Sequence, residues 1–420
     1  MIIRDHSRVV ASSPFKTTVA SAQVAGILSG LTALIERNVS FALIGRGDCM
    51  SYVASGRLEH VFVRMAADVE IVFHRDSTLR NAVFNALTAT GYQGEALNVS
   101  FVISDAVIRL ADDVNATNNA TMTTSMMPLS IYVMYIAQPF SRSLLMSLHH
   151  VSVILKAPAV GQGGKVGVMI LQQAVSDVVI DVRECQLDLA GDDLTALVVS
   201  SSPRPSTNVL IIATTTTLRM VGSGSCFVLS FYAGLANVTA LLIDSDVDVF
   251  PGRMNPSGHV LAAQGVAMYD RPVQPLSNIA FVVLASNITV RRDLLLTSND
   301  IAGQSVVASL FHGGSFYNRP NFTMLTPPLT MSFFICKTTI RAVNTPLSRT
   351  SLIVLNSERQ GRNPGACANV AWWMNSPSLS ASTMAIFRFL STVATKTGEW
   401  KKADVEDATA ATSSAASFDN

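Results

Sequence analysis

The chain has 420 residues, of which 49% are apolar and only 14% are charged, and its formal net charge is +1. This composition supports a large core and excludes a chain that is disordered throughout. The balance of 30 Lys and Arg against 29 Asp and Glu, without a long basic run, argues against nucleic acid and anionic membrane surfaces as partners.

The N-terminal sequence predicts neither a signal peptide nor a membrane-spanning helix. Residues 1–18 contain an early Asp and His and lack the apolar core of about 7–15 residues that a signal peptide needs. The uncharged run 17–35 holds several Ser, Thr, Gly and Gln, whereas a spanning helix needs about 20 predominantly apolar residues. We expect residues 1–20 to form a flexible segment or cap, and membrane attachment would need segments flanking this sequence.

A repeated pattern follows, in segments that begin with Asn or Asp. Their second, fourth, sixth, eleventh and thirteenth residues are all apolar, in the segments 98–110, 177–189, 208–220, 237–249 and 278–290. Looser copies are expected at 38, 60 and 321–333. Because side chains of a strand alternate between two faces, each segment predicts a strand, a short bend near its middle and a second strand.

A third strand-like run lies between successive segments, at 194–200, 225–232, 259–266 and 305–311. Three short strands per unit are what a right-handed parallel β-helix, a solenoid, requires. We therefore predict an all-β fold, with the solenoid over residues 21–365. A leucine-rich-repeat horseshoe and a stacked β-sandwich are the rivals, but the leucine-rich signature is absent.

The leading Asn of each repeat has two interpretations. Asn tolerates left-handed backbone angles, so it suits a sharp bend, and stacked units would align such residues into a hydrogen-bonded ladder. The alternative is N-glycosylation, because N-x-S/T sequons occur at Asn38, Asn98, Asn115, Asn119, Asn237, Asn287 and Asn321. Asn115 and Asn119, in an expected loop, are the best acceptors if the chain enters a secretory pathway.

Carboxylates provide the main candidates for chemistry. Asp244, Asp246 and Asp248 alternate along one segment, which fits a Ca²⁺ site or an acid/base pair, or solvent-facing residues between inward Val247 and Val249. The sequence GDD at 191–193 and GH at 258–259 resemble the Asp pair and Gly-His of polygalacturonases, although other segments of that family are missing. The weak catalytic candidates are Asp192, Asp193, Asp246 and His259.

Other reactive residues do not form a recognisable motif. The five cysteines, Cys49, Cys185, Cys226, Cys336 and Cys367, are scattered, which predicts free buried thiols or, in an exported chain, one or two disulfides. The pair His149–His150 is expected to supply a bend residue that replaces the usual Asn rather than a metal site, because neighbouring residues of a strand face opposite sides. The segment GQGGK at 161–165 lacks the spacing of a phosphate loop and predicts a turn.

The C-terminal sequence changes in character. We expect residues 366–400 to cap the solenoid, with a short helix from about 382 to 393 and with Trp372 and Trp373 buried in the cap. Residues 401–420 are polar and lack apolar periodicity, which predicts a disordered tail.

The units NVSFVIS, DVVIDVREC and NVTALLID resemble the dispersed gene family surface proteins of trypanosomes, over roughly residues 95–345. The resemblance implies a pectin-lyase-like parallel β-helix, a surface location and an adhesive role. Those proteins are much longer and carry membrane spans, so this chain is expected to be a truncated member.

These observations predict a non-enzymatic cell-surface or secreted protein that presents a long face for adhesion or ligand binding. Its expected partner is a host or matrix protein or a glycan, with no cofactor and no metal. The alternative is a polysaccharide lyase or glycoside hydrolase on the same scaffold, which would need Asp193 and the Asp246 region, with or without His259, to converge within about 10 Å.

Overall fold

The fold was obtained as a computed structural model and is all-β. Every element in the described part of the chain is a strand, 32 in all, and no helix occurs there. The expected all-β class is therefore confirmed. The structure describes residues 1–75, 83–91, 94–111, 129–157, 164–199, 206–222, 226–231, 235–250, 258–267, 276–291, 308–317, 331–343, 350–357, 370–375, 378–380, 385–394, 400–402 and 408–409.

The strands fall into an N-terminal, a middle and a C-terminal group. The N-terminal group is β1 (Ile2–Arg4), β2 (Arg8–Val24), β3 (Leu28–Ser29), β4 (Thr32–Glu36), β5 (Ser40–Ala54), β6 (Leu58–Ala66), β7 (Val69–Arg75), β8 (Val83–Gly91), β9 (Glu95–Ala111), β10 (Ser130–Ala137), β11 (Phe140–Lys156) and β12 (Lys165–Leu171). The middle group is β13 (Ala174–Arg183), β14 (Gln186–Gly191), β15 (Asp193–Val199), β16 (Ser206–Thr214), β17 (Thr217–Gly222), β18 (Cys226–Phe231), β19 (Leu235–Ile243), β20 (Asp246–Phe250) and β21 (Gly258–Ala267). The C-terminal group is β22 (Leu276–Leu284), β23 (Asn287–Arg291), β24 (Ala308–Tyr317), β25 (Met331–Cys336), β26 (Thr339–Val343), β27 (Thr350–Ser357), β28 (Val370–Asn375), β29 (Ser378–Ser380), β30 (Ala385–Ala394), β31 (Trp400–Lys402) and β32 (Ala408–Thr409).

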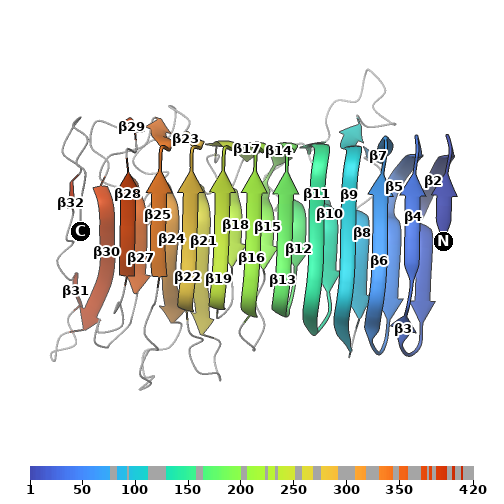
Figure 1. The fold of residues 1–420 in the computed structure, drawn as a ribbon, viewed down its shortest axis with the longest axis horizontal. Coiled ribbons are helices and arrows are strands. Elements are labelled where there is room, and N and C mark those ends of the chain that lie inside the picture. Colours follow the sequence, from blue (N-terminus) through green and yellow to red (C-terminus); the bar gives the residue numbers. More distant parts are fainter. Residues whose placement is uncertain are drawn as a thin grey trace.

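From β13 to β27 each strand pairs in parallel with the strand three places later. The result is three ladders that run side by side along the molecule (Figure 1). We name the ladder β6–β9–β11–β13–β16–β19–β22–β25 the long ladder. The second ladder contains β14, β17, β20, β23 and β26, and the third contains β12, β15, β18, β21, β24 and β27.

The interior is formed by the apolar positions of the repeat. Val178, Val209, Val238 and Ile279 are aligned on successive strands of the long ladder, and all four are buried. The other predicted core positions of the five repeat segments are buried as well, except Leu110 and Ala213, which are partly buried against the same core. Because every unit contributes the same positions, one continuous hydrophobic core results.

Each of the five repeat segments turns at two corners. The leading residue adopts a positive φ in all five repeats, with Asn208 at 55°, Asn237 at 58° and Asn278 at 53°. This confirms the predicted bend. The second corner follows the strand at the eighth position, where Asp244 has a φ of 46°, and we call it the tight corner.

The looser copies of the repeat are partly confirmed. The first strand of the copy expected at 60 is confirmed, because His60 has a φ of 53° and Val61 pairs with Val99. The other two expected copies are placed differently, and one further copy was not predicted. The structure pairs Met331 with Ile279, so the copy expected at 321–333 begins at residue 330, and Asn321 lies outside the described residues. The segment at Asn38 begins the second strand of a unit, because Ser40 pairs with Glu70. A further copy at 143–155 begins with Ser143, whose φ is 56°, and lacks the Asn or Asp used to find the others.

The predicted helix near 382–393 is wrong where the structure describes it. Residues 385–394 form β30, which pairs in parallel with β27, with Phe387 opposite Ile353 and Phe389 opposite Leu355. Alternating Phe residues followed by Thr and Val favour a strand over a helix, and the neighbouring ladder supplies the hydrogen-bond partners. Trp372 and Trp373 lie in β28, another strand of the sheet.

The chain ends also contain strands. Residues 8–24, of which the larger part falls in the expected flexible segment, form β2, which pairs in parallel with β5. β31 and β32 pair antiparallel with β30, and the rest of the predicted tail lies outside the described residues.

Among the residues that the structure describes, no helix has the length and apolar character needed to span a membrane. The predicted domain limits at 20, 365 and 400 remain predictions.

Candidate functional site

The weak catalytic candidates lie on different parts of the sheet. Asp192 is buried at the corner between β14 and β15, where its Oδ2 accepts a hydrogen bond from the Gly164 N–H at 3.2 Å. Asp193 opens β15. Asp246 is exposed at the start of β20, where its Oδ1 accepts a hydrogen bond from Asn287 Nδ2 at 2.8 Å.

The register separates these carboxylates. Asp246 is aligned through Thr217 with Gln186, the first residue of β14, whereas Asp192 follows the last residue of that strand. At about 3.3 Å per residue, the two carboxylates are roughly 20 Å apart along the strand direction, which exceeds the spacing of a glycosidase pair. His259 lies in β21, paired with Phe227, and its side chain is outside what the structure describes.

Metal ligands do not gather in the described part of the chain. No group of three or more His, Cys, Asp or Glu residues there is placed to hold a metal ion. Asp244 and Asp246 are exposed and Asp248 is half-buried, while Val247 before Asp248 and Val249 after it are buried. This arrangement agrees with solvent-facing carboxylates on a strand whose alternate residues form the core.

The leading Asn residues form a hydrogen-bonded ladder. Asn278 Nδ2 donates to Asn237 Oδ1 at 3.1 Å, and Asn237 Nδ2 donates to Asn208 Oδ1 at 3.1 Å. Asn208 Nδ2 in turn donates to Asp177 Oδ1 at 2.8 Å. Hydrogen bonds from Asn208 and Ser176, together with Arg142, hold the pKa of Asp177 below its usual value.

The ladder bears on the predicted sequons, because N-glycosylation uses the Asn side-chain nitrogen. That nitrogen contacts the neighbouring unit at Asn237 and Asn287, and at Asn98, where it lies 3.5 Å from His60 Nδ1. Asn38 is exposed at a corner, with a φ of 57°. Asn115 and Asn119, the preferred acceptors, and Asn321 lie outside the described residues. Use of the sequons therefore stays a prediction.

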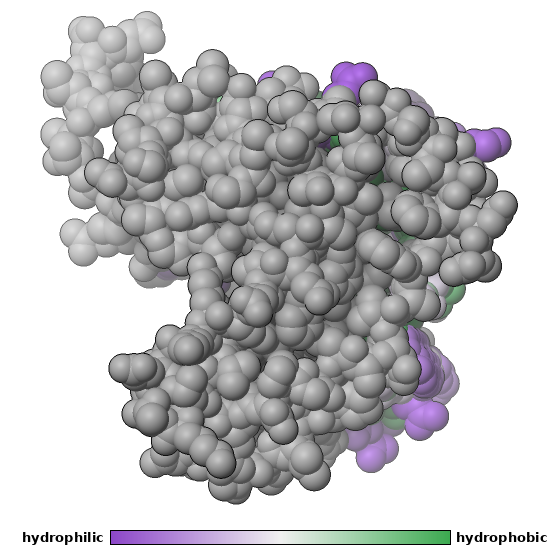
Figure 2. Space-filling model, turned by 90° about the vertical axis from the view of Figure 1, so that its left-hand side faces the viewer, coloured by the Kyte–Doolittle hydropathy of each residue, from purple (hydrophilic) through white to green (hydrophobic). Residues whose placement is uncertain are grey.

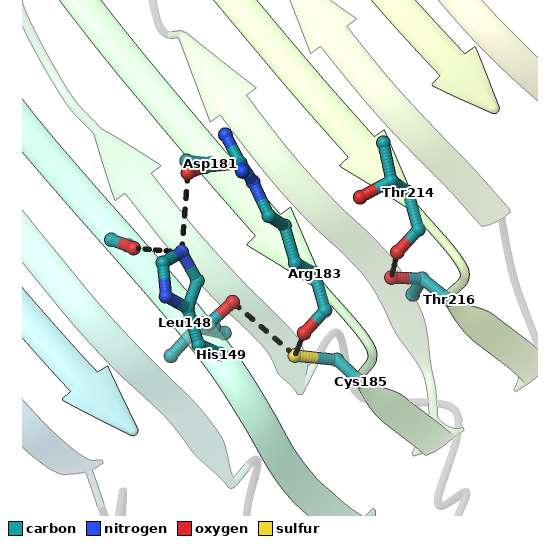
Figure 3. Close-up of polar contacts among 8 residues, drawn as sticks. Leu148, His149, Asp181, Arg183, Cys185, Thr214 and Thr216 are labelled. Carbon is teal, nitrogen blue, oxygen red and sulfur yellow. Dashed lines mark hydrogen bonds and ion pairs between the residues drawn. The ribbon is translucent and has the colours of Figure 1, made fainter. Parts of the chain in front are cut away.

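A polar cluster occupies the outward side of β11 and β13 in the long ladder (Figure 3). The register places Ser147 opposite Asp181 and His149 opposite Arg183. His149 Nε2 lies 3.1 Å from Asp181 Oδ2 and 2.9 Å from Ser147 Oγ. Arg183 Nε donates to Asp181 Oδ1 at 2.7 Å, so both oxygens of this largely buried carboxylate have a donor.

The cluster does not have the geometry of a catalytic triad. In a triad the hydroxyl and the carboxylate contact different nitrogens of the imidazole, so that the ring can relay a proton. Here both contact Nε2 of His149. The ring is thus oriented without activating Ser147.

His150, the neighbour of His149, lies at the tight corner and has a φ of 52°. The expected bend at this His pair is confirmed, but it is the second corner of a unit and does not replace the leading Asn. His150 Nε2 lies 2.6 Å from Glu184 Oε2, and its Nδ1 lies 3.6 Å from Asp105 Oδ1. All three side chains are more than half exposed, which extends the polar surface around the corner.

Small buried side chains line the inside of the tight corner, at the ninth position of the repeat. Thr216 donates its hydroxyl to the Thr214 carbonyl at 3.0 Å, and Ser245 donates to the Ile243 carbonyl at 2.8 Å. Cys185 occupies the same position and donates its S–H to the carbonyls of Arg183 and Leu148 (Figure 3). Burial raises the pKa of the Cys185 thiol to about 11.

The corner itself was predicted from sequence as a short bend near the middle of each segment, but its buried small side chains were missed although a signal was present. The ninth position holds Ala, Cys, Thr, Ser and Ser in the five segments, and all of these side chains are small. The cysteines Cys49, Cys185, Cys226 and Cys336 are free, the first three of them buried, as expected, while Cys367 lies outside the described residues.

Of the segment 161–165, Gly164 and Lys165 are described, and Lys165 opens β12.

Beyond the polar cluster the outward positions of the long ladder become apolar. The register aligns Asp181 with Ile212, then Leu241, Val282 and Phe334 on the following strands. We name seven outward apolar residues of these strands the apolar outer face: Leu210, Ile212, Leu241, Ile243, Val282, Leu284 and Phe334. The first six are half-buried, and Phe334 is 38% exposed. Seen end-on from the C-terminal side, the described residues in view are mostly hydrophilic ones at the right-hand edge, with a few hydrophobic atoms beside them (Figure 2).

Comparison of the chain with known proteins yields no matching family model, no matching curated protein and no matching solved structure.

Proposed function

We propose that the chain is a right-handed parallel β-helix that acts as a non-enzymatic binding protein at the cell surface or after secretion. Its binding surface is the outward side of the long ladder. The observation that carries the proposal is the alignment of outward positions into one long surface, which changes from the polar cluster to the apolar outer face.

The parallel pairing of every third strand supports a β-helix over the rival folds. A β-sandwich of hairpins would need antiparallel neighbours, whereas β13, β16, β19 and β22 pair in parallel. Right-handed winding is supported by the strong preference for right-handed crossovers between parallel strands. It also agrees with Figure 1, where the long-ladder strands at the front point upward and the chain proceeds from right to left.

Two features support binding over catalysis. The carboxylates Asp192 and Asp246 are held far apart by the register, and the imidazole of His149 is fixed through a single nitrogen. A flat sheet surface with few charges suits contact with a macromolecule, because binding there requires no enclosed cavity. The surface location rests on the resemblance of the repeat units to trypanosome surface proteins. The expected partner is a host or matrix protein or a glycan.

Binding and turnover can be measured on the same purified chain. We expect it to bind at least one member of a panel of glycans and matrix proteins without degrading any of them. Replacing Leu241 by Lys on the apolar outer face or Arg183 by Glu in the polar cluster is expected to weaken binding about tenfold, because each places a mismatched charge in the contact. Turnover of a polysaccharide that is abolished by Asp193→Asn would contradict the proposal.

A further inference from the structure

A pair of tyrosines lies on the outward side of the third ladder, which β10 and β8 extend towards the N-terminus. Tyr132 and Tyr135 both belong to β10, and the residues next to each of them, such as Ile131 and Val133, are buried in the core. Because alternate side chains of a strand face opposite sides, both rings point away from the interior. The rings stack on each other, with centroids 5.5 Å apart and an angle of 19° between their planes. The pair therefore forms an aromatic surface on a face that the binding surface proposed above does not include.

The strand β12 holds the two rings in place. Gly167 lies opposite Tyr132, and a Cβ at residue 167 would lie 3.2 Å from Tyr132 Cδ1 and 2.9 Å from the Thr195 carbonyl oxygen. A side chain at this position would displace the ring, so glycine is needed there. Tyr135 donates its hydroxyl to Gln172 Oε1, just after the end of the same strand. Both tyrosines are half-buried, so each ring is fixed on one side and keeps part of its surface open to solvent.

Beside the rings lies a buried amide with an unused acceptor. Asn85 is opposite Tyr132, on β8. It faces outward, because its neighbours Phe84 and Ala86 belong to the core. Its Nδ2 donates to Asp48 Oδ1 at 2.6 Å, but its Oδ1 is buried and has no hydrogen-bond partner among the residues that the structure describes. A buried acceptor without a donor costs free energy, which a ligand hydroxyl would recover, either directly or through one water.

The surroundings of the rings favour an uncharged ligand. The register places uncharged residues beside them on β8 and β12, namely Asn85, Thr88, Gly167 and Ile170. Lys165 begins β12 opposite Asp193, so the charges at the edge of the site have opposite signs. An ionic ligand would lose its hydration here without gaining an opposite charge beside the rings. Aromatic surface takes up C–H groups, and an amide oxygen accepts from hydroxyls, and a pyranose ring offers both, with C–H groups on one face and hydroxyls around its rim.

We propose that Tyr132, Tyr135 and Asn85 form a binding site for a neutral saccharide, with a pyranose ring on the tyrosines and one of its hydroxyls donating to Asn85 Oδ1. We name these three residues the tyrosine site. The site lies on the third ladder, so it does not depend on the binding proposed for the long ladder. Because neighbouring contacts already fix the two rings, little conformational entropy is lost when a ligand binds to them.

Calorimetric titration of the full chain tests the proposal. The probes are three neutral hexasaccharides, maltohexaose, cellohexaose and chitohexaose, and the acidic hexagalacturonate. We expect at least one neutral probe to bind with a dissociation constant of about 0.1–1 mM, and the acidic probe to bind about tenfold more weakly or not at all. Tyr132→Leu and Tyr135→Leu should each raise the constant about tenfold, because they remove the ring and keep apolar bulk. Tyr135→Phe keeps the ring and should have a smaller effect, and the matched control Leu241→Lys, on the long ladder, should have none.

Fluorine NMR provides a second measurement that does not depend on folding of the leucine variants. The chain has seven tyrosines, and in a sample labelled with 3-fluorotyrosine the resonances of Tyr132 and Tyr135, assigned from Tyr→Phe variants, should shift most when the neutral probe is added. The proposal is overturned if no neutral probe binds at about 10 mM, if other tyrosines shift instead, or if the acidic probe binds more tightly. Binding that is lost in Leu241→Lys but kept in both leucine variants would overturn the tyrosine site alone, and the binding function proposed for the long ladder would stand.

Discussion

The two corners of each unit solve the same geometric problem with different chemistry. Both turn the chain through a residue with positive φ, as at Asn237 and Asp244. At the first corner, exposed Asn amides bond from unit to unit. At the second corner, buried hydroxyls bond to carbonyls of their own unit and to N–H groups of the preceding one. A regular repeat can therefore carry one ladder that is open to water and one that is sealed from it, and the sealed ladder should contribute more to stability.

The largest difference between the corners is expected from Ser245→Val. The hydroxyl of Ser245 donates to the Ile243 carbonyl and accepts from the Thr216 N–H at 3.2 Å, in a position that is 2% exposed. Valine has about the same volume as threonine, but it leaves the Ile243 carbonyl and the Thr216 N–H without this hydrogen-bond partner. We expect the free energy of unfolding to fall by about 1–3 kcal/mol, measured by denaturant titration.

The control for this change is Ser245→Thr. The same position holds Thr216 and Thr338 in other units, so the corner accepts the extra methyl group and keeps the hydroxyl. Its effect on unfolding should be much smaller. Equal losses for the Val and Thr variants would show that bulk, and not the hydroxyl, matters at this corner.

The second effect concerns alkaline pH at the same corner. The pKa of Cys185 rises from 9.0 to about 11 on folding, so the folded chain holds the thiol proton more tightly than the unfolded chain. The stability contribution is complete below pH 9 and is lost as the pH rises through about 11. At pH 10 the loss should be about 1 kcal/mol in the wild type and absent in Cys185→Thr, measured as the pH dependence of unfolding in both chains.

A smaller effect is expected at the exposed corner from Asn237→Ala. The substitution removes two amide hydrogen bonds in contact with water and places Ala at a φ of 58°. We expect a loss of about 1 kcal/mol, most of it from the backbone conformation. Asn237→Gly, which accepts this conformation, should lose less. If Asn237→Ala and Asn237→Gly both lost as much free energy of unfolding as Ser245→Val, the exposed corner would not be the weaker contributor to stability, against our expectation.

The smallest effect is expected from Asp177, which ends the Asn ladder. Its pKa is lowered in the fold, so its contribution to stability is present above its ordinary value of 3.8 and declines as the pH falls through the folded value. Because the side chain is exposed, the decline should be slight. The decline is measured by comparing the free energy of unfolding at acid pH in the wild type and in Asp177→Asn. An identical pH dependence in both chains would contradict the predicted contribution of Asp177.

Much of the fold could be predicted from the sequence because its core positions repeat with a period of two. The alternation of Val238, Ala240 and Leu242 predicts an inward face and Asn237 predicts a bend, and both predictions are confirmed. The copy that begins at residue 330 is predicted nine residues too early, because Asn321 mimics the leading residue while Met331 starts the paired strand. The predicted helix near 382–393 is wrong because the local sequence pattern carries no information about pairing with a distant strand such as β27.

The candidate site was harder to predict than the fold. Ser147 and His149 lie on one strand and Asp181 and Arg183 on the next, so only the register between the strands brings them together. The apolar outer face is likewise brought together only by the register between strands, since its members look like ordinary strand residues in the sequence. Conversely, the carboxylates of the GDD segment and of β20 looked compatible in sequence but are separated by the length of a strand.

The central claim is that successive units stack directly on one another along the long ladder. Spin labels on cysteines at positions 145 and 332 test it, because the register connects Leu145 through Val179, Leu210, Thr239 and Ala280 to Ser332. Five steps of ~4.8 Å predict a Cα separation of about 24 Å, with positions 145 and 280 about one step closer. A single narrow distance near this value, shortened as predicted in the second pair, supports the stack. A broad distribution, or distances that do not follow the number of steps, contradicts it.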